Sequence, residues 1–224
     1  MSWLDIFRKK ANKIPEVEHY ESLFEVDHAK NTALKELSFV VLDTETTGLD
    51  VKKDHVLAFG GVKIIKGRIK VDTSMESLLF STKQNVSSIK IHEIIQSNDA
   101  MPIDDFVKEL LPYLGKHIMV AHHAGFDLAM LEKLVKPYGL RKILNPIVDT
   151  GDLAIRIEHG VPYDPNRINL ENYSLDALCE RYNIPIHDRH TAAGDAFLTA
   201  QLLLKLLKEA EKRGIKTYGD LMRY

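Results

Sequence analysis

Asp43 and Glu45 stand two residues apart at the end of an apolar run that begins at Phe39. The run has the pattern of a buried strand, and a Thr/Gly turn follows it. Side chains two apart on a strand point to the same face, so the two carboxylates can converge on one point. Two hard anionic oxygen donors at one point suit Mg²⁺ or Mn²⁺. Taken alone, the pair is better explained as ordinary acids at a strand end, since strand ends are commonly polar.

Two further acids follow later strands. Asp127 ends the run His122-His-Ala-Gly-Phe-Asp127, which comes directly after an apolar strand and opens a helix. Asp149 ends a short strand that begins at Pro146. Ligands bind at the carboxyl ends of strands in α/β sheets, so we expect these acids and Asp43 to lie along one edge.

The run His190-Thr-Ala-Ala-Gly-Asp195 adds an imidazole and a carboxylate. His190 lies where a loop meets a long helix, and the small residues before Asp195 permit close approach to another element. Four acids and a histidine are what metal-assisted phosphodiester hydrolysis requires. Two cations about 4 Å apart stabilise the attacking and leaving oxygens, while a base with a pKa near 6.5 takes a proton from water.

The elements that must position these residues occur in the order three strands, helices, strand, helix, strand, helices. Residues 54–65 and 68–80 form a predicted hairpin, with its turn at Lys66-Gly67. Helices are predicted from Pro102 to Leu114 and from Thr191 to Lys212. This order predicts an α/β fold with a mixed, five-stranded central sheet flanked by helices.

The rest of the chain is divided by the same patterns. Helices are predicted over residues 2–12 and 17–37, and we expect this extension to pack on the back of the domain. A short helical segment is predicted over 87–95, and another after residue 212. The predicted organisation is a helical extension (1–36), a catalytic domain (37–212) and a short C-terminal segment (213–224).

Composition limits the classes of function. The 224 residues are 45% hydrophobic and 28% charged, with a formal net charge of −2, so no global field attracts a polyanion. Contact with nucleic acid must therefore be local and helped by bound metal. The single cysteine, Cys179, cannot form an internal disulfide, and we expect it in the core. We find neither a signal-peptide core nor a spanning apolar stretch, so a soluble, cytoplasmic protein without membrane contact is expected.

The three motifs together resemble those of the DnaQ-like DEDDh 3′-to-5′ exonucleases, a family that includes the proofreading epsilon subunit of bacterial DNA polymerase III. The motifs are Asp43-Thr-Glu-Thr-Thr-Gly48, His122-His-Ala-Gly-Phe-Asp127 and His190-Thr-Ala-Ala-Gly-Asp195. The resemblance covers about residues 38 to 210. It implies a ribonuclease-H-like fold and release of nucleoside 5′-monophosphates. The sister branch has Tyr in the third motif where this chain has Thr191, so the histidine branch applies.

The resemblance also implies roles for particular residues. Two divalent ions, Mg²⁺ or Mn²⁺, would be bound by Asp43, Glu45, Asp127 and Asp195, and His190 would be the general base; these five are the expected catalytic residues. Contacts to the terminal nucleotide are expected from Thr44, Thr46, Thr47, Gly48, Leu49, His92 and His123. A surface histidine on a short helix explains His92 nearly as well. The second motif of the family often reads His-Asn, and His123 stands at the Asn position. Asp149 is expected to support the site without binding metal, and His187 to be a loop histidine.

Three functions fit this sequence. The first is an exonuclease acting on the 3′ end of single-stranded or frayed DNA, in proofreading, repair or trimming. The second is an exoribonuclease, because no residue fixes discrimination at the 2′-hydroxyl. The third is a nucleic-acid-binding module without activity, which has no need of four converging acids. Polymerase-bound members of the family carry a flexible tail after the catalytic domain, where this chain has only residues 212–224. We therefore expect a free-standing exonuclease or a loose association with DNA polymerase.

Overall fold

The computed structural model describes residues 13–80 and 100–223. The strands are β1 (Ser38–Thr46), β2 (Val56–Ile65), β3 (Arg68–Phe80), β4 (Met101–Pro102), β5 (Ile118–Ala121) and β6 (Ile147–Asp149). The α-helices are α1 (Pro15–Ser22), α3 (Ile103–Leu114), α4 (Ala124–Val135), α5 (Thr150–His159), α6 (Leu175–Arg181), α7 (Ala192–Lys212) and α8 (Tyr218–Leu221). Short 3₁₀ turns lie at Leu34–Glu36, Lys136–Tyr138, Pro165–Arg167 and Leu170–Tyr173.

The strands form one mixed sheet in the order β4-β3-β2-β1-β5-β6. β1 lies inside the sheet, antiparallel to β2 and parallel to β5. The predicted α/β class is therefore confirmed, but the predicted number of five strands is too low. The additional strand is β4, whose two residues pair with the end of β3. Two residues that include a proline at a sheet edge carry no alternating pattern, so the sequence gives no sign of this strand.

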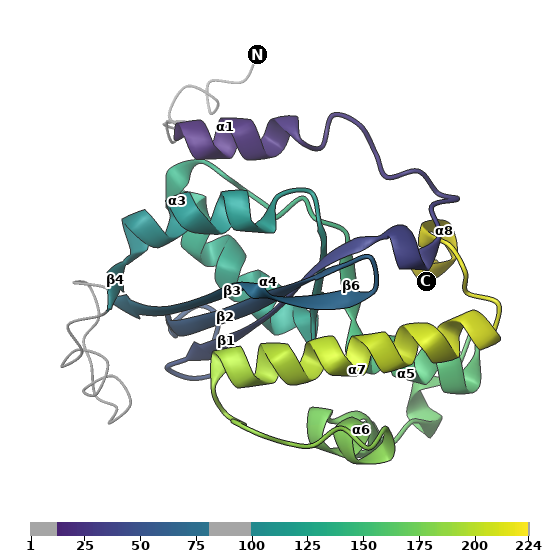
Figure 1. Cartoon of the computed structure of the whole chain (residues 1–224). Helices are drawn as coiled ribbons and strands as arrows, with labels where there is room; N and C mark the ends of the chain where they lie inside the picture. The colour runs from purple at the N-terminus through teal and green to yellow at the C-terminus, as the bar shows by residue number, and fades with distance from the viewer. Residues whose placement is uncertain (1–12, 81–99, 224) are drawn as a thin grey trace, which may run out of the picture.

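Helices cover both faces of the sheet (Figure 1). On one face, Val40 and Leu42 of β1 share a core with α1, α3 and α4. On the other face, Phe39 and Val41 share a core with α5, α6 and α7. All four side chains are buried, so successive residues of β1 pack alternately into the two apolar layers on either side of the sheet. Continued to the end of the strand, the alternation directs Asp43 and Glu45 toward α7 and Thr44 toward α4.

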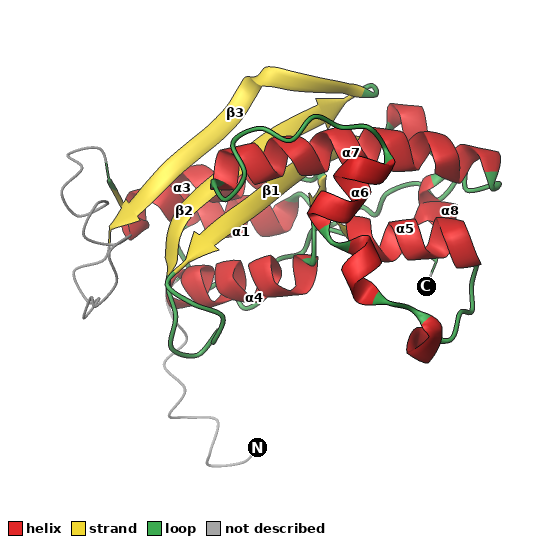
Figure 2. Ribbon diagram, turned by 90° about the horizontal axis from the view of Figure 1, so that it is seen from below, coloured by secondary structure: helices red, strands yellow, loops and turns green. Residues whose placement is uncertain are grey.

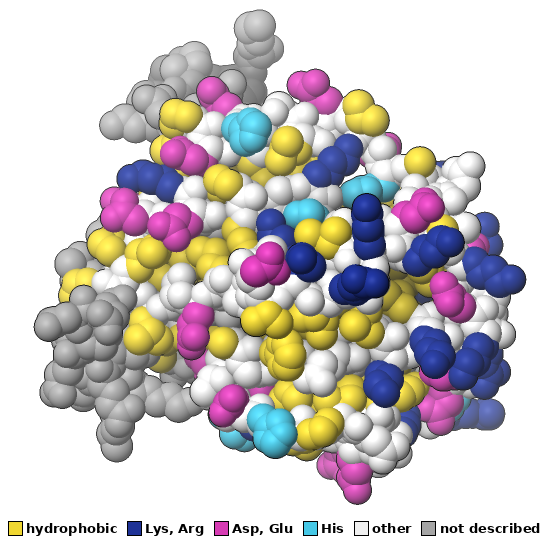
Figure 3. Space-filling model, in the orientation of Figure 1, with side chains coloured by type: hydrophobic (Ala, Val, Ile, Leu, Met, Phe, Trp, Pro, Cys, Tyr) yellow, Lys and Arg dark blue, Asp and Glu magenta, His cyan; other side chains and the backbone are white. Residues whose placement is uncertain are grey.

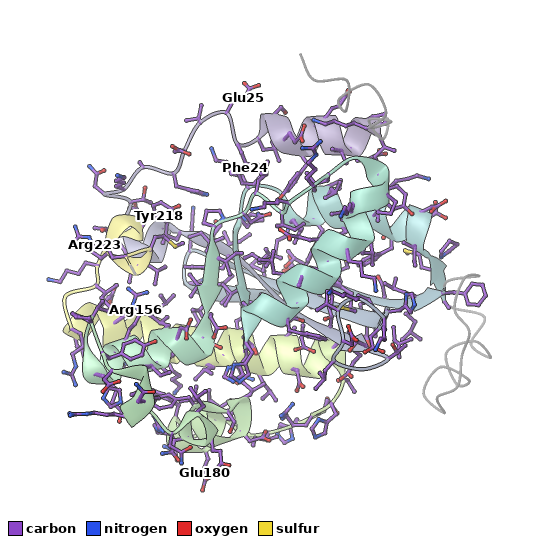
Figure 4. The ribbon with its side chains drawn as sticks, turned by 180° about the vertical axis from the view of Figure 1, so that it is seen from behind. Phe24, Glu25, Arg156, Glu180, Tyr218 and Arg223 are labelled. Carbon is purple, nitrogen blue, oxygen red and sulfur yellow. The ribbon has the colours of Figure 1, made fainter. Side chains whose placement is uncertain are left out.

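The segment before β1 packs on the domain, but its predicted helix over 17–37 is too long. α1 ends at Ser22, and apart from the short turn Leu34–Glu36 the chain then runs without helix to β1. The physical reason is that residues 25–31 contain one large apolar side chain, Val26, which is 72% exposed, so a continued helix would bury nothing. Phe24 packs against the core through the ring of Tyr20, whereas Glu25 is exposed (Figure 4).

The C-terminal segment lies beside this N-terminal segment. Ala33 and Thr217 form an isolated bridge, and the guanidinium of Arg156 donates hydrogen bonds to the carbonyls of Leu221 (2.9 Å) and Asp220 (3.2 Å). Figure 4 shows Arg156, Tyr218 and Arg223 around α8.

Figure 3 shows Lys and Arg gathered on the right-hand edge, the side on which α7 ends. Cations at a helix C-terminus complement its dipole, and this edge is remote from the start of α7.

Several other expectations have a definite outcome. Cys179 is fully buried, as predicted. The hairpin turn Lys66-Gly67 is present, and both residues have positive φ. Among the described residues we find no helix with the length and apolar character needed to cross a membrane. The helices predicted over 2–12 and 87–95 lie outside the described residues. The boundaries 1–36, 37–212 and 213–224 stay a prediction.

We predict that Tyr20→Phe destabilises the protein by about 1–3 kcal/mol, because the buried Tyr20 hydroxyl donates to Asn145 Oδ1 (2.5 Å) and accepts from the Leu144 amide (2.8 Å). Urea unfolding measures the change. Tyr138→Phe is the control, since its hydroxyl bonds Asp104 in a position open to water, and a smaller loss is expected. Equal losses in the two variants would contradict a specific role of Tyr20 in docking α1.

Candidate metal centre

Three of the predicted metal ligands converge. Asp43 and Glu45 from the end of β1 and Asp195 from α7 each offer a carboxylate oxygen, and these atoms lie within 4.8 Å of one another. The alternation of β1 explains the first two, because both project from the face that α7 covers. The third comes from a residue about 150 positions later in the chain. Oxygen atoms at this separation can bind one hard divalent ion.

The approach of α7 depends on a glycine in β2. Asp43 pairs across the sheet with Gly60. A Cβ at Gly60 would lie 2.1 Å from the backbone carbon of Ala192, at the start of α7. Only a residue without a side chain therefore lets the first turn of α7 reach the strand. Figure 2 shows α7 lying across β1 and β2. This contact confirms the close approach predicted from the small residues of the third motif.

Asp195 is held at one oxygen and open at the other. Arg189 donates a hydrogen bond to its Oδ2. Its Oδ1 is buried and has no hydrogen-bond partner among the described residues. A buried carboxylate oxygen without a partner is costly, and a cation bound between Asp195, Asp43 and Glu45 would satisfy it. This orphaned oxygen and the all-oxygen donor set fit the expected Mg²⁺ or Mn²⁺.

Asp127, the fourth predicted metal ligand, is not part of this cluster of three acids. It is 4% exposed and stands in the first turn of α4, as predicted. Its Oδ1 accepts a hydrogen bond from the Thr44 hydroxyl at 2.7 Å. Within the described residues, the carboxylates close enough to share an ion do not include Asp127. Thr44 is buried, so its side chain positions Asp127, and its expected contact to a nucleotide stays a prediction, as does metal binding by Asp127.

The packing of acids changes their protonation. Burial, followed by the charges of Asp127, Asp195 and Glu45, raises the pKa of Asp43 to about 9. Burial raises the pKa of Asp127 to about 6, although the hydrogen bond from Thr44 opposes the shift. Without a cation, Asp43 therefore keeps a proton at neutral pH. A divalent ion would displace that proton, so metal binding and deprotonation of Asp43 are linked.

The turn after β1 is rigid and presents one apolar side chain. The Thr46 hydroxyl donates to the Gly48 carbonyl, and the Thr47 hydroxyl to Asp54 Oδ1, each at 2.7 Å. A Cβ at Gly48 would lie 2.7 Å from Asp54, which explains the glycine. The next residue, Leu49, is 84% exposed. An apolar side chain held out by a fixed turn is suited to contact a base or sugar, but the nucleotide contacts of this turn stay a prediction.

The second motif has a structural and an exposed histidine. His122 Nδ1 lies 2.8 Å from the Thr150 hydroxyl, and burial lowers the pKa of His122 to about 4. His123 is exposed, with a left-handed backbone at φ 61°, and its ring packs edge-on against the ring of His122, with 4.4 Å between the centroids. Asp149 accepts hydrogen bonds from the amides of Ala124 (2.7 Å) and Gly151 (2.8 Å). It therefore joins the starts of α4 and α5, which is the supporting role expected for it.

The predicted base lies in the loop that leads into α7. His190 is exposed and has φ 63°. On α6, the hydrogen bond from Arg189 lowers the pKa of Asp176. His187 is exposed in the same loop, as expected. His92 lies outside the described residues. Arg189 and Asp176 were missed by the sequence reasoning, since an Arg before His190 and an Asp on a separate helix share no spacing that marks them.

Comparison with known proteins agrees with this site. The model of the RNase T family, described as exonuclease, matches residues 40–203. The PolC-type DNA polymerase III of Bacillus cereus is 32% identical over 193 residues, 84% of this chain and 12% of the polymerase. The PolC-type enzyme of Caldanaerobacter subterraneus is 32% identical over 200 residues, 86% of this chain and 13% of the polymerase. The chain thus spans roughly an eighth of the length of these relatives.

Solved structures share the fold. Exonuclease I of E. coli in complex with single-stranded DNA has a TM-score of 0.63 at 14% identity, covering 79% of this chain and 42% of that chain. The nuclease domain of 3′hExo, a DEDDh family member bound to rAMP, has a TM-score of 0.61 at 10% identity, covering 82% of this chain and 95% of that chain. The fold is therefore that of the DEDDh nucleases. The chain belongs to the RNase T exonuclease family, and the resemblance stated from its three motifs is confirmed.

We predict that the metal-free protein loses stability as the pH rises from about 6 to 9. In this range folded Asp43, with its pKa of about 9, keeps a proton that the unfolded chain, with a pKa of 3.8, has released. The melting temperature in EDTA should fall across this range, and Asp43→Asn should flatten the fall. With Mn²⁺ present the trend should weaken or reverse, because the ion binds the deprotonated site. An equal fall in Asp43→Asn would contradict the assignment to Asp43.

Proposed function

We propose that the chain is a metal-dependent 3′-to-5′ exonuclease. It hydrolyses phosphodiester bonds at the 3′ end of single-stranded or frayed DNA and releases nucleoside 5′-monophosphates. The observation that carries the proposal is the convergence of Asp43, Glu45 and Asp195 within 4.8 Å, in a chain of an exonuclease family. A module that only bound nucleic acid would gain nothing from three acids placed where a phosphate must come, because they repel it.

Asp43, Glu45 and Asp195 would hold the catalytic ion, and Asp43 with Asp127 a second. Bound there, two Mg²⁺ or Mn²⁺ ions would supply an activated water and would stabilise charge on the attacking and leaving oxygens. Asp127 keeps the strand end and α4 together through its hydrogen bond from Thr44. His190, exposed in the loop that leads into α7, takes the proton of the attacking water. A neutral imidazole is suited to this step at physiological pH.

The terminal nucleotide lies on the turn that follows β1. The turn from Thr46 to Leu49 contacts it, and exposed Leu49 packs against its sugar or base and separates it from the stack. His123 and His92 contribute further contacts. The hydroxyls of Thr46 and Thr47 already bond within the turn, and the Thr47 amide donates to the His55 carbonyl at 2.9 Å. These two residues therefore act through the fixed shape of the turn.

DNA is the preferred substrate in this proposal, and RNA is the second candidate. Exonuclease I, which shares the fold, has been solved in complex with a dT13 oligonucleotide. A structure of similar fold describes 3′-end recognition of a histone mRNA stem-loop by a 3′-exonuclease. Each title concerns that protein alone, so both polymers belong in the assay.

A loose association with DNA polymerase is proposed for this chain, which we place in the cytoplasm. The PolC-type relatives contain the matched region within a polymerase, so the exonuclease fold is compatible with such a partner. Recovery of a stoichiometric complex with polymerase in a pull-down would contradict a loose association and would show that the chain is a fixed polymerase subunit.

We predict a ladder that shortens from the 3′ end when 5′-labelled single-stranded DNA is digested with Mg²⁺ or Mn²⁺, and no ladder in EDTA. Asp43→Asn should remove the activity, since it loses a metal ligand at nearly constant volume. The RNA counterpart is digested in parallel, and the faster polymer identifies the substrate. Absence of a ladder on both polymers with either ion would overturn the enzymatic proposal in favour of a binding module.

We predict that His190→Ala lowers kcat by about 10²–10⁴-fold, the usual contribution of a general base. His187→Ala is the matched control, because His187 is exposed three residues earlier in the same loop, and its kcat should stay close to that of the parent. Steady-state kinetics on the faster polymer measure both. Equal kcat values for His190→Ala and the parent would exclude His190 as the base.

A further inference from the structure

Arg189 joins two carboxylates, one of which belongs to the metal centre. Its Nε and Nη2 donate to the two oxygens of Asp176, at 2.5 and 3.2 Å. Its Nη1 donates to Asp195 Oδ2. The Arg189 side chain is 20% exposed, Asp195 10% and Asp176 57%. The guanidinium therefore lies between a carboxylate near the surface and a buried one.

The consequence for Asp195 is that its two oxygens differ. Oδ2 is held by Arg189, whereas Oδ1 is buried and lacks a partner within the described part of the chain. A carboxylate fixed at one oxygen cannot rotate freely, so the other oxygen keeps its direction. Hydrogen bonds to the distal atoms of metal ligands act in this way in many metal sites.

The loop around Arg189 is also fixed to α7. The Thr191 hydroxyl donates to the Asp188 carbonyl (2.7 Å) and accepts from the Gly194 amide (3.1 Å). A Cβ at Gly194 would lie 2.0 Å from the Asp188 carbonyl oxygen. Arg189 is thus attached by its backbone to the first turn of α7 and by its side chain to α6. His190 is the next residue in the chain, so the same contacts also fix the backbone position of the predicted base.

We propose that Arg189, held by Asp176, is a positioning residue that orients Asp195 so that Oδ1 faces the metal. The proposal rests on the proposed metal-dependent function, and it assigns to this pair a role in ion affinity. The planar guanidinium suits the role because its donors form a rigid fork that contacts both carboxylates at once. A lysine ammonium carries the same charge but cannot reproduce that geometry.

The positive charge of Arg189 and its orienting role predict opposite effects on ion affinity. A fixed positive charge beside a metal ligand repels a cation, so removing it should tighten ion binding if charge were its main contribution. Orientation predicts that removing it weakens binding. The sign of the change in the dissociation constant therefore separates the two roles.

The test is Mn²⁺ binding to the substrate-free full chain, measured by calorimetry, together with the melting temperature in EDTA. Arg189→Ala should raise the Mn²⁺ dissociation constant by about 10–100-fold, the usual effect of losing a group that orients a metal ligand. Arg189→Lys should not restore the parent value. Asp176→Ala should weaken binding less, and adding it to Arg189→Ala should cause no further loss, because Asp176 acts through Arg189.

Arg181→Ala is the matched control. Arg181 also bonds a carboxylate, Glu158 at 3.1 Å, and lies over the Tyr173 ring, but it does not contact the acids of the metal centre. It should lower the melting temperature without changing the dissociation constant. Since Asp176 is more than half exposed, Asp176→Ala remains informative if Arg189→Ala does not fold.

Unchanged or tighter Mn²⁺ binding in Arg189→Ala would overturn the proposal, and so would full restoration by Arg189→Lys. A parent protein that binds no Mn²⁺ would overturn the proposed metal-dependent function and this inference with it. A parent that binds Mn²⁺ while all Arg189 and Asp176 variants bind it equally well would overturn this inference alone.

Discussion

Repulsion among carboxylates is the constraint on which the rest of the structure depends. Three acids offer oxygens within 4.8 Å of one another, and Asp127 adds its charge from behind. Such an arrangement is unfavourable without a cation: burial first, and then the charges of the neighbouring acids, raise the pKa of Asp43. It persists because each acid is attached to an element whose place is decided elsewhere, by apolar burial. The apolar packing of the two cores thus holds together carboxylates that would otherwise move apart because they repel one another.

A small number of contacts between elements of the fold holds the acids in place. β1 is buried on both faces before its first acid, so its end cannot shift sideways. Gly60 brings α7 onto that end, Thr44 fixes Asp127, and Asp149 ties the starts of α4 and α5. Each of these contacts joins two elements at the same edge of the sheet. The site is therefore a meeting point of elements, and no single element contains it.

Much of this could be predicted from the sequence, because motif spacing and apolar alternation are local signals. They gave the α/β class, the same-face pair on β1 and Asp127 in the first turn of a helix. Contacts decided by tertiary packing could not be predicted this way. Among these contacts are the hydrogen bond from Thr44 to Asp127 and the bonds of Arg189 to acids on two separate helices. The short strand β4 likewise exists only because it pairs with the end of β3.

The most direct test of the central claim is a crystal structure of the protein with Mn²⁺, with the ion located by its anomalous scattering. Our account predicts a peak between Asp43, Glu45 and Asp195, with Oδ1 of Asp195 as a ligand and Oδ2 still bonded to Arg189. A peak elsewhere, with these three carboxylates unliganded, would contradict it.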